Sequence, residues 1–203
     1  MSPAAPSASL EALREEARGC QRCPLWQIGT QTVFGDGPAA ARAMFVGEAP
    51  GYNEDQQGQP FVGAAGALFD EALAAAGIDR DQLYVTNTVK HRPYEPGGRH
   101  GKNRPPKQSE INACRVWLDQ ELALIRPEIL CLMGAVAAKA VLGKDFKLTQ
   151  SRGQWLESHV APHAIATLHP SVILVRPDPV SRDEARRSFF ADIALVGERL
   201  RNS

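Results

Sequence analysis

The stretch of sequence that decides the fold runs from Met44 to Leu73 and reads MFVGEAPGYNEDQQGQPFVGAAGALFDEAL. It opens with an apolar run over 44–46, which predicts a buried strand. The strand is broken at once by Gly47, Pro50 and Gly51. One carboxylate, that of Glu48, lies between these breakers, and a polar loop is expected over 53–59. The pattern indicates a strand that ends in an irregular segment carrying one acidic side chain.

A helix is expected after this loop. Leu68, Phe69 and Leu73 recur at helical spacing and would share one face. Phe61 stands at the entrance of that helix, where its ring suits either core filling or a stacking platform. Open α/β sheets place ligands where a strand enters such a loop and helix, at the carboxyl end of the strand. The stretch therefore points to a pocket beside Glu48.

Composition narrows the class of protein. With 203 residues and 43% hydrophobic content, one domain over 9–203 is expected after a flexible tail over 1–8. The 23 basic and 23 acidic residues balance, so nucleic-acid binding would need a local basic patch. The sequence shows no signal-peptide core and no apolar stretch of membrane length. A soluble, cytoplasmic monomer without membrane contact is expected.

Strand and helix patterns alternate along the rest of the chain. Further strands are expected over 83–89, 128–133 and 164–168. Ser9 caps a first short helix, and the other helices are expected over 109–125, 134–142 and 181–201. A hairpin is expected over 146–157. The alternation predicts a three-layer α/β/α fold with a central, mainly parallel, four-stranded sheet.

Three polar residues fall at the carboxyl ends of predicted strands: Glu48, Asn87 and His169. Taken singly, each has an ordinary interpretation, such as a surface carboxylate or an amide satisfied by nearby backbone. Because the ends of parallel strands share one edge of a sheet, we expect all three to lie together beside Phe61. Such a group suits a planar, polar ligand.

A basic segment over 92–107 reads RPYEPGGRHGKNRPPK. Its density of proline and glycine predicts no regular structure. The segment is either a solvated loop or a loop that contacts phosphate. Its candidates for contact with nucleic acid are Arg99, His100, Lys102, Asn103 and Arg104.

Four cysteines in such a chain favour metal or redox chemistry over disulfides. Cys20 and Cys23, closed by Pro24, have a spacing that can place both sulfurs on one metal. The alternative is two unrelated thiols. Cys131 lies within a predicted strand and is expected in the core.

Taken together, these motifs resemble those of the uracil-DNA glycosylase superfamily. The similarity is carried by Gly47-Glu48-Ala49-Pro50-Gly51, Glu54-Asp55, Pro60-Phe61-Val62-Gly63 with Gly66, and His169-Pro170-Ser171. It is greatest toward family 4, the iron–sulfur branch, and its relative family X. The resemblance implies a DNA repair hydrolase that cleaves the N-glycosidic bond of uracil in single- or double-stranded DNA and leaves an abasic site.

The resemblance also implies how the pocket acts. Phe61 would stack on a flipped-out uracil, and Asn87 would hydrogen-bond its O4 and N3–H edge. His169 would donate to uracil O2 as the base departs. Glu48 would position or activate the water that attacks the sugar.

Two further contacts follow from the same resemblance. Ala49 is placed among the substrate-binding residues. Ser171 would hold a phosphate, and the apolar residues Val172, Ile173 and Leu174 would wedge into the vacated base stack.

The resemblance also implies a role for three of the cysteines. Cys20, Cys23 and Cys114 match three ligands of a [4Fe–4S] cluster, and His91 stands where the fourth falls. Zinc could use the same ligands, and the cluster is favoured over zinc.

One departure concerns the basic segment. In family X a loop histidine attaches covalently to the sugar after uracil leaves. Asn103 falls at that position here, with His100 three residues earlier, so turnover is favoured over trapping. Two alternatives stay open: a uracil-DNA binding protein that forms a stable adduct through His100, and a non-catalytic iron–sulfur nucleic-acid binder.

Overall fold

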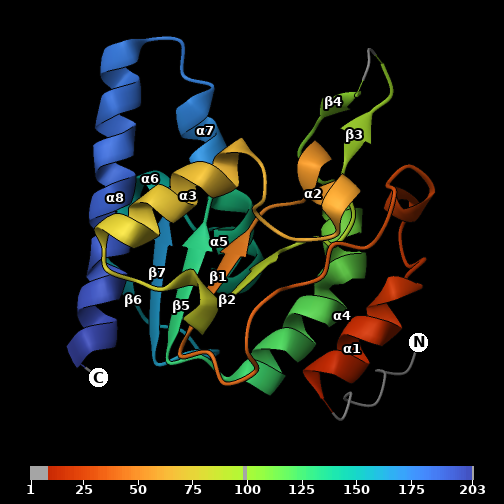
Figure 1. The fold of residues 1–203 in the computed structure, drawn as a ribbon, viewed down its shortest axis with the longest axis horizontal. Helices are drawn as coiled ribbons and strands as arrows, with labels where there is room; N and C mark the ends of the chain where they lie inside the picture. The colour runs from red at the N-terminus through yellow and green to blue at the C-terminus, as the bar shows by residue number, and fades with distance from the viewer. Residues whose placement is uncertain (1–8, 98–99, 203) are drawn as a thin grey trace.

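The computed structural model describes residues 9–97 and 100–202 (Figure 1). A five-stranded sheet in the order β2-β1-β5-β7-β6 lies at its centre. The strands are β1 (Ala43–Gly47), β2 (Leu83–Asn87), β5 (Ile129–Met133), β6 (Trp155–Leu156) and β7 (His163–Thr167). The first four in sheet order are parallel, and β6 pairs antiparallel with β7 at the edge.

Helices cover both faces of this sheet, as the α/β/α prediction requires. One face carries α1 (Leu10–Arg18), α4 (Gln108–Ile125) and α5 (Ala135–Leu142). The other carries α3 (Ala64–Ala75), α7 (Pro170–Leu174) and α8 (Pro179–Asn202). Strands buried on both faces are near-continuous apolar runs. In β1, Met44 and Val46 accordingly pack toward α4, while Phe45 packs toward α3.

Most predicted elements are confirmed within a few residues. Ser9 caps α1 through a bond from the Ala12 N–H to its hydroxyl. Cys131 is buried in β5 as expected. The predicted number of strands was wrong, because the fifth strand, β6, has only two residues and alternation cannot reveal so short a strand. The hairpin expected over 146–157 was also wrong: a short helix, α6 (Leu148–Ser151), precedes β6.

Two segments expected to be irregular are ordered. The predicted loop over 53–59 overlaps the helix α2 (Tyr52–Gln57). The basic segment contains an antiparallel pair, β3 (Tyr94–Glu95) and β4 (Lys102–Asn103). Both segments are held by side-chain contacts with other parts of the chain. Composition alone does not predict such contacts. The remaining elements are two short 3-10 helices, η1 (Pro24–Gln27) and η2 (Arg80–Gln82).

The predicted tail over 1–8 and the candidate Arg99 lie outside the described residues. Among the helices that are described, none is long and apolar enough to cross a membrane. The carboxyl ends of the parallel strands open between α7 on one side and the β3–β4 pair with α2 on the other (Figure 1).

Candidate active site

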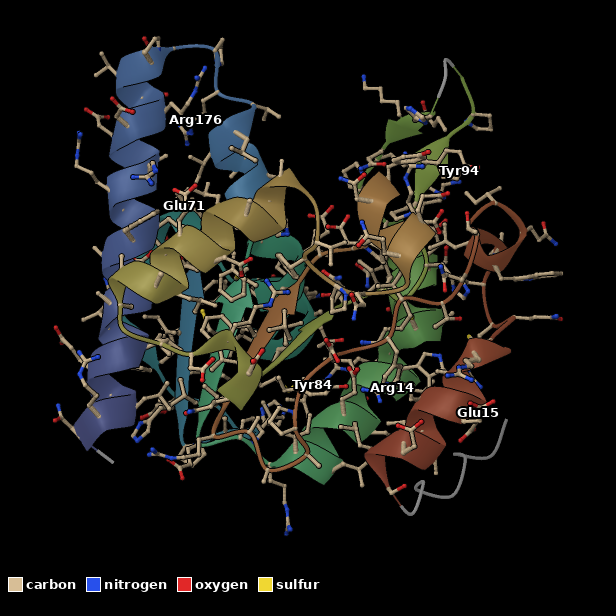
Figure 2. All side chains as sticks on the ribbon, in the orientation of Figure 1. Arg14, Glu15, Glu71, Tyr84, Tyr94 and Arg176 are labelled. Atoms are coloured by element: carbon tan, nitrogen blue, oxygen red, sulfur yellow. The ribbon has the colours of Figure 1, made fainter. Side chains whose placement is uncertain are left out.

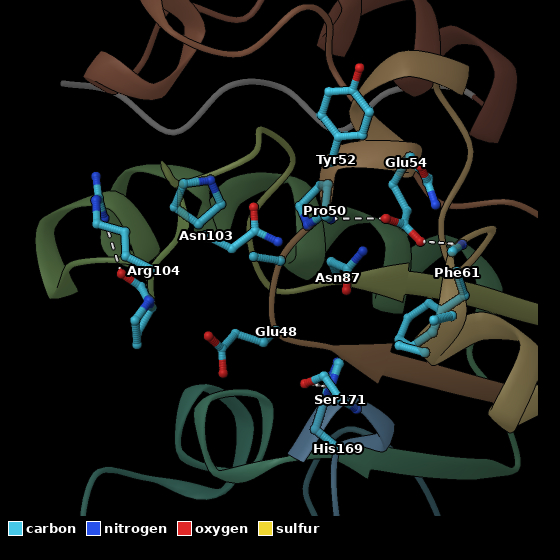
Figure 3. A pocket seen from close by; sticks show the side chains of 18 residues that line it. Glu48, Pro50, Tyr52, Glu54, Phe61, Asn87, Asn103, Arg104, His169 and Ser171 are labelled. Atoms are coloured by element: carbon cyan, nitrogen blue, oxygen red, sulfur yellow. Dashed lines mark hydrogen bonds between the residues drawn. The ribbon is translucent and has the colours of Figure 1, made fainter. Parts of the chain in front are cut away.

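A cavity of about 390 Å³ lies at this end of the sheet (Figure 3). It brings together most of the predicted site residues: Glu48, Ala49, Phe61, Asn87, Asn103, Arg104, His169 and Ser171. His100 and Lys102 are not part of its lining. Figure 3 shows Glu48, Asn87 and His169 facing the same open space from three separate segments.

Phe61 enters the cavity in an unusual backbone conformation. Its φ is +57°, in the left-handed region that non-glycine residues rarely occupy. Such strain costs on the order of 1–3 kcal/mol and persists only where the surroundings enforce it. Gly66 makes room for it, since a Cβ there would lie 1.8 Å from the Phe61 carbonyl oxygen. Gly47 makes room for the ring, because a Cβ there would lie 2.5 Å from Phe61 Cζ.

Asn87 ends β2 and is buried, with 2% of its surface exposed. Among the described residues its Oδ1 has no hydrogen-bond partner. An unpaired buried acceptor costs about 1–3 kcal/mol, so a ligand that donates to this oxygen would recover a real penalty. The following residue is held firmly, because the Thr88 N–H and hydroxyl both donate to the Gly47 carbonyl, each at 2.9 Å.

His169 caps the first turn of α7. The Ser171 backbone N–H donates to His169 Nδ1 at 3.2 Å, and the Ser171 hydroxyl lies 2.8 Å from the same nitrogen. Since Nδ1 accepts, the proton of the neutral ring lies on Nε2. The side chain as a whole is half-buried, yet Nε2 is buried and without a partner among the described residues. Burial lowers the pKa of His169 to about 4, so the imidazole is neutral at pH 7.

Glu48 follows β1 at the wall of the cavity. Burial raises the pKa of its carboxyl above the usual 4.5. A carboxylate with a raised pKa is a stronger base than an ordinary one.

Glu54 connects two of the loops that wall the cavity. From the sequence it was identified only as part of a motif. Its Oε2 accepts from the Gly51 N–H at 3.1 Å and its Oε1 from the Gly63 N–H at 2.7 Å, as the dashed lines in Figure 3 show. One carboxylate thus ties the loop after Glu48 to the loop that carries Phe61. Since Gly51 directly precedes α2, the bond from its N–H to Glu54 is the glutamate half of a capping box.

Arg92 anchors the basic segment and was not among the predicted site residues. Its guanidinium lies 5.3 Å from the Tyr52 ring centroid and 4.4 Å from that of Tyr94. It donates to Asn103 Oδ1 at 2.6 Å and to the His100 carbonyl at 2.9 Å. The His100 ring packs on Tyr52, with centroids 4.2 Å apart. Asn103 lines the cavity and His100 does not, although the Tyr52 ring on which His100 packs is part of the lining.

Arg104 is engaged by another acid. Its guanidinium donates to both carboxylate oxygens of Glu110, at 2.9 and 2.7 Å. This pairing lowers the pKa of Glu110. Because Glu110 offsets the positive charge of Arg104, Arg104 would attract a negatively charged ligand less strongly.

The predicted metal ligands come from three segments. The Trp117 indole N–H donates to Cys20 Sγ and the Lys90 backbone N–H to Cys114 Sγ, both at 3.2 Å. Burial raises the pKa of Cys114 to about 12, and the nearby Cys20 and Cys23 thiols add to the rise.

The fourth predicted ligand is differently engaged. His91 Nε2 lies 3.1 Å from the Thr32 hydroxyl. Within residues 9–97 and 100–202, no group of three or more His, Cys, Asp or Glu side chains is arranged to hold a metal ion. Cysteine sulfurs that accept hydrogen bonds from N–H groups are suitable ligands for a sulfur-ligated metal group. His91 could join them only by giving up its contact with the Thr32 hydroxyl.

Comparison with known proteins gives a consistent result. The chain matches the family model described as the Uracil DNA glycosylase superfamily over residues 34–194. It is 39% identical to the type-4 uracil-DNA glycosylase of Sulfurisphaera tokodaii over 178 residues, 84% of this chain and 78% of the relative. It is 36% identical to the type-4 enzyme of Thermotoga maritima, with 91% of each chain covered. For the type-4 enzyme of Pyrobaculum aerophilum the identity is 35%, with 92% of each chain covered.

Proposed function

This chain belongs to the uracil DNA glycosylase superfamily, and we propose that it is a DNA repair hydrolase that cleaves the N-glycosidic bond of uracil in DNA. The products are free uracil and an abasic site. The observation that carries the proposal is the meeting of Glu48, Asn87 and His169 around one cavity walled by Phe61.

Base capture comes first. A uracil flipped from the stack would lie against Phe61 with its pairing edge toward Asn87. The unpaired Asn87 Oδ1 accepts from uracil N3–H, and the amide NH₂ donates to O4. Cytosine has no N3–H and presents an amino group in place of O4. With the amide in this orientation cytosine would leave the buried oxygen unpaired, and sites of this kind discriminate strongly against such analogues.

Cleavage of the bond places negative charge on the departing base. The Nε2–H of neutral His169 donates to uracil O2 as that charge develops. A neutral donor suits this task, because the ring keeps its proton on Nε2 while Ser171 holds Nδ1. Glu48 in its ionised form orients the attacking water and accepts its proton.

The same membership leads us to assign a [4Fe–4S] cluster to Cys20, Cys23, Cys114 and His91, with zinc as the rival metal. The group would cross-link segments far apart in sequence, so its contribution is to folding. Its presence is tested by absorbance near ~400 nm in anaerobically purified protein, as expected of a thiolate-ligated cluster. A colourless preparation with stoichiometric zinc would decide for the rival.

Turnover is the better-supported outcome after the base leaves. His100 does not line the cavity, and Asn103, which lines it at the position in question, is a poor nucleophile. Water is then the group that reaches the sugar.

The test uses a uracil-containing oligonucleotide, single- or double-stranded, run on denaturing gels with and without alkali. Strand cleavage only after alkali supports a monofunctional glycosylase. A protein–DNA band that survives SDS, and that His100→Ala removes, would replace turnover by trapping. Binding without either product would leave a non-catalytic nucleic-acid binder.

A further inference from the structure

Lys90 and Glu121 form a buried ion pair that the scheme above does not use. Lys90 Nζ lies 2.7 Å from Glu121 Oε2, and neither side chain is exposed. Nζ also donates to the Thr86 hydroxyl at 2.6 Å and to the Asn87 carbonyl at 2.8 Å, so all three ammonium hydrogens are used. Hydroxyl donors from Thr86 and Tyr84 complete the contacts of the Glu121 carboxylate.

The pair connects α4 to the end of β2. Lys90 reaches α4 at two points: its backbone N–H donates to Cys114 Sγ, and its Nζ donates to Glu121. Positions 114 and 121 are two helical turns apart and therefore lie on one face of α4. Figure 2 labels Tyr84, which lies between the sheet and this helix. These two hydrogen bonds of Lys90 attach the segment 87–90 to α4 immediately after β2 ends.

Asn87 is the residue that this connection positions. Side chains alternate along a strand, so Tyr84 and Thr86 point toward Glu121 while Asn87 points to the opposite face, toward Phe61. No hydrogen bond within the described residues holds Asn87 Oδ1. The place from which this side chain starts is set by its backbone, and Lys90 Nζ holds the Asn87 carbonyl directly.

We propose that the Lys90–Glu121 pair is a positioning device that holds the Asn87 backbone at the place from which its amide meets the uracil edge. The proposal rests on the function proposed above. Stability of the fold does not by itself account for the pair, because well-packed apolar replacements of buried ion pairs are often neutral or stabilising. A role in holding Asn87 accounts for the third hydrogen bond of the ammonium group.

The double variant Lys90→Met/Glu121→Leu tests this role, because it removes both charges and leaves neither one unpaired. The control is Arg42→Met/Glu128→Leu, which removes a 2.8 Å ion pair at the other end of β1. For both variants and the unmodified protein we would measure kcat and KM on uracil-DNA, inhibition by free uracil, the thermal midpoint and absorbance near ~400 nm.

We expect the Lys90/Glu121 variant to fold and keep its absorbance, with a lowered thermal midpoint because the Tyr84 hydroxyl, the Thr86 hydroxyl and the Asn87 carbonyl lose their partners. At temperatures where the variant is fully folded, kcat/KM should fall by about 10²-fold, the scale of loss from a misplaced contact. Inhibition by free uracil should weaken in parallel, and the control should match the unmodified protein. Unchanged kcat/KM in the folded double variant would overturn the proposal. So would a fall of kcat/KM confined to temperatures at which the variant begins to unfold, which would indicate structural support only.

Thr86→Val provides the test where the double variant does not fold. It nearly keeps the shape of the side chain but removes the hydroxyl that accepts from Lys90 and donates to Glu121. A raised KM in folded Thr86→Val supports positioning, and wild-type kinetics overturn it. Absence of uracil release by the unmodified protein would contradict the proposed function, whereas equal release by all variants contradicts the positioning role alone.

Discussion

Ser171 donates its backbone N–H to His169 Nδ1 across 3.2 Å, which leaves the proton of the neutral ring on Nε2 at the cavity wall. His169→Asn removes this donor from the departing base. We expect kcat to fall by about 10²–10³-fold, as for loss of one oxyanion donor. Ser171→Ala keeps the backbone bond to Nδ1 and should lower kcat far less. Single-turnover rates on one oligonucleotide compare the two, and equal losses would show that the hydroxyl, and not the backbone, holds the ring.

Burial of His169 also predicts how stability changes with pH. The folded protein holds the ring neutral down to about pH 4, whereas the ordinary value is 6.5. Between these values the unfolded chain binds more protons, so the free energy of unfolding should fall as pH is lowered from 6.5 toward 4. Urea denaturation at pH 7 and pH 5 measures the change. His169→Asn should lose less stability over this interval, and an identical loss in both proteins would mean that other groups carry it.

Glu48 is expected to determine the acid limb of the pH profile of uracil release. Burial raises its pKa above 4.5, and only the ionised form can accept a proton from water, so the rate should rise with pH through this raised pKa. Glu48→Gln keeps shape and hydrogen bonding but loses basicity, and should slow release by about 10²–10⁴-fold. The pH profile of uracil release by the variant should lack that limb. A limb that persists unchanged in Glu48→Gln would assign it to another group.

Much of this site was predictable from sequence, for a definite reason. Glu48, Asn87 and His169 fall at the ends of apolar runs long enough to be recognised as strands, and parallel topology then brings those ends together. The β3–β4 pair and β6 could not be predicted, since each strand has two residues and too little alternation to detect. Their places depend on tertiary contacts such as those of Arg92.

The predicted wedge is corrected by burial. Ile173 has only 1% of its surface exposed and packs in the core on the α3–α8 face, so it cannot enter a base stack. Val172 and Leu174 on the same short helix are exposed, at 44% and 42%. The reason is that residues 170–174 form a helix, which turns one of the three apolar side chains inward.

Gly66 is predicted to be essential for the conformation of Phe61. Gly66→Ala would place a Cβ 1.8 Å from the Phe61 carbonyl oxygen, so the loop must shift. We expect the free energy of unfolding to fall by about 1–3 kcal/mol and KM to rise as the stacking ring is displaced. Gly19→Ala is the matched control, since its Cβ would meet nothing within 4 Å. Equal stability and KM in the two variants would contradict the proposed packing.

Asn103 is predicted to occupy the position from which a nucleophile could reach the sugar. Asn103→His should compete with water and give some SDS-stable adduct on uracil-DNA, because position 103 lines the cavity. The unmodified protein should give none, and adding His100→Ala to Asn103→His should leave the adduct in place. No adduct from Asn103→His with turnover intact would mean that this side chain does not reach the sugar.

The most direct test of the account counts uracil molecules. The protein is incubated with a large excess of uracil-containing oligonucleotide, and free uracil released per protein molecule is followed over time beside Asn87→Ala. The account predicts many uracils per protein molecule, none from the matched cytosine oligonucleotide, and a large loss in the variant. Release that stops at one uracil per protein, or that Asn87→Ala leaves unchanged, would contradict it.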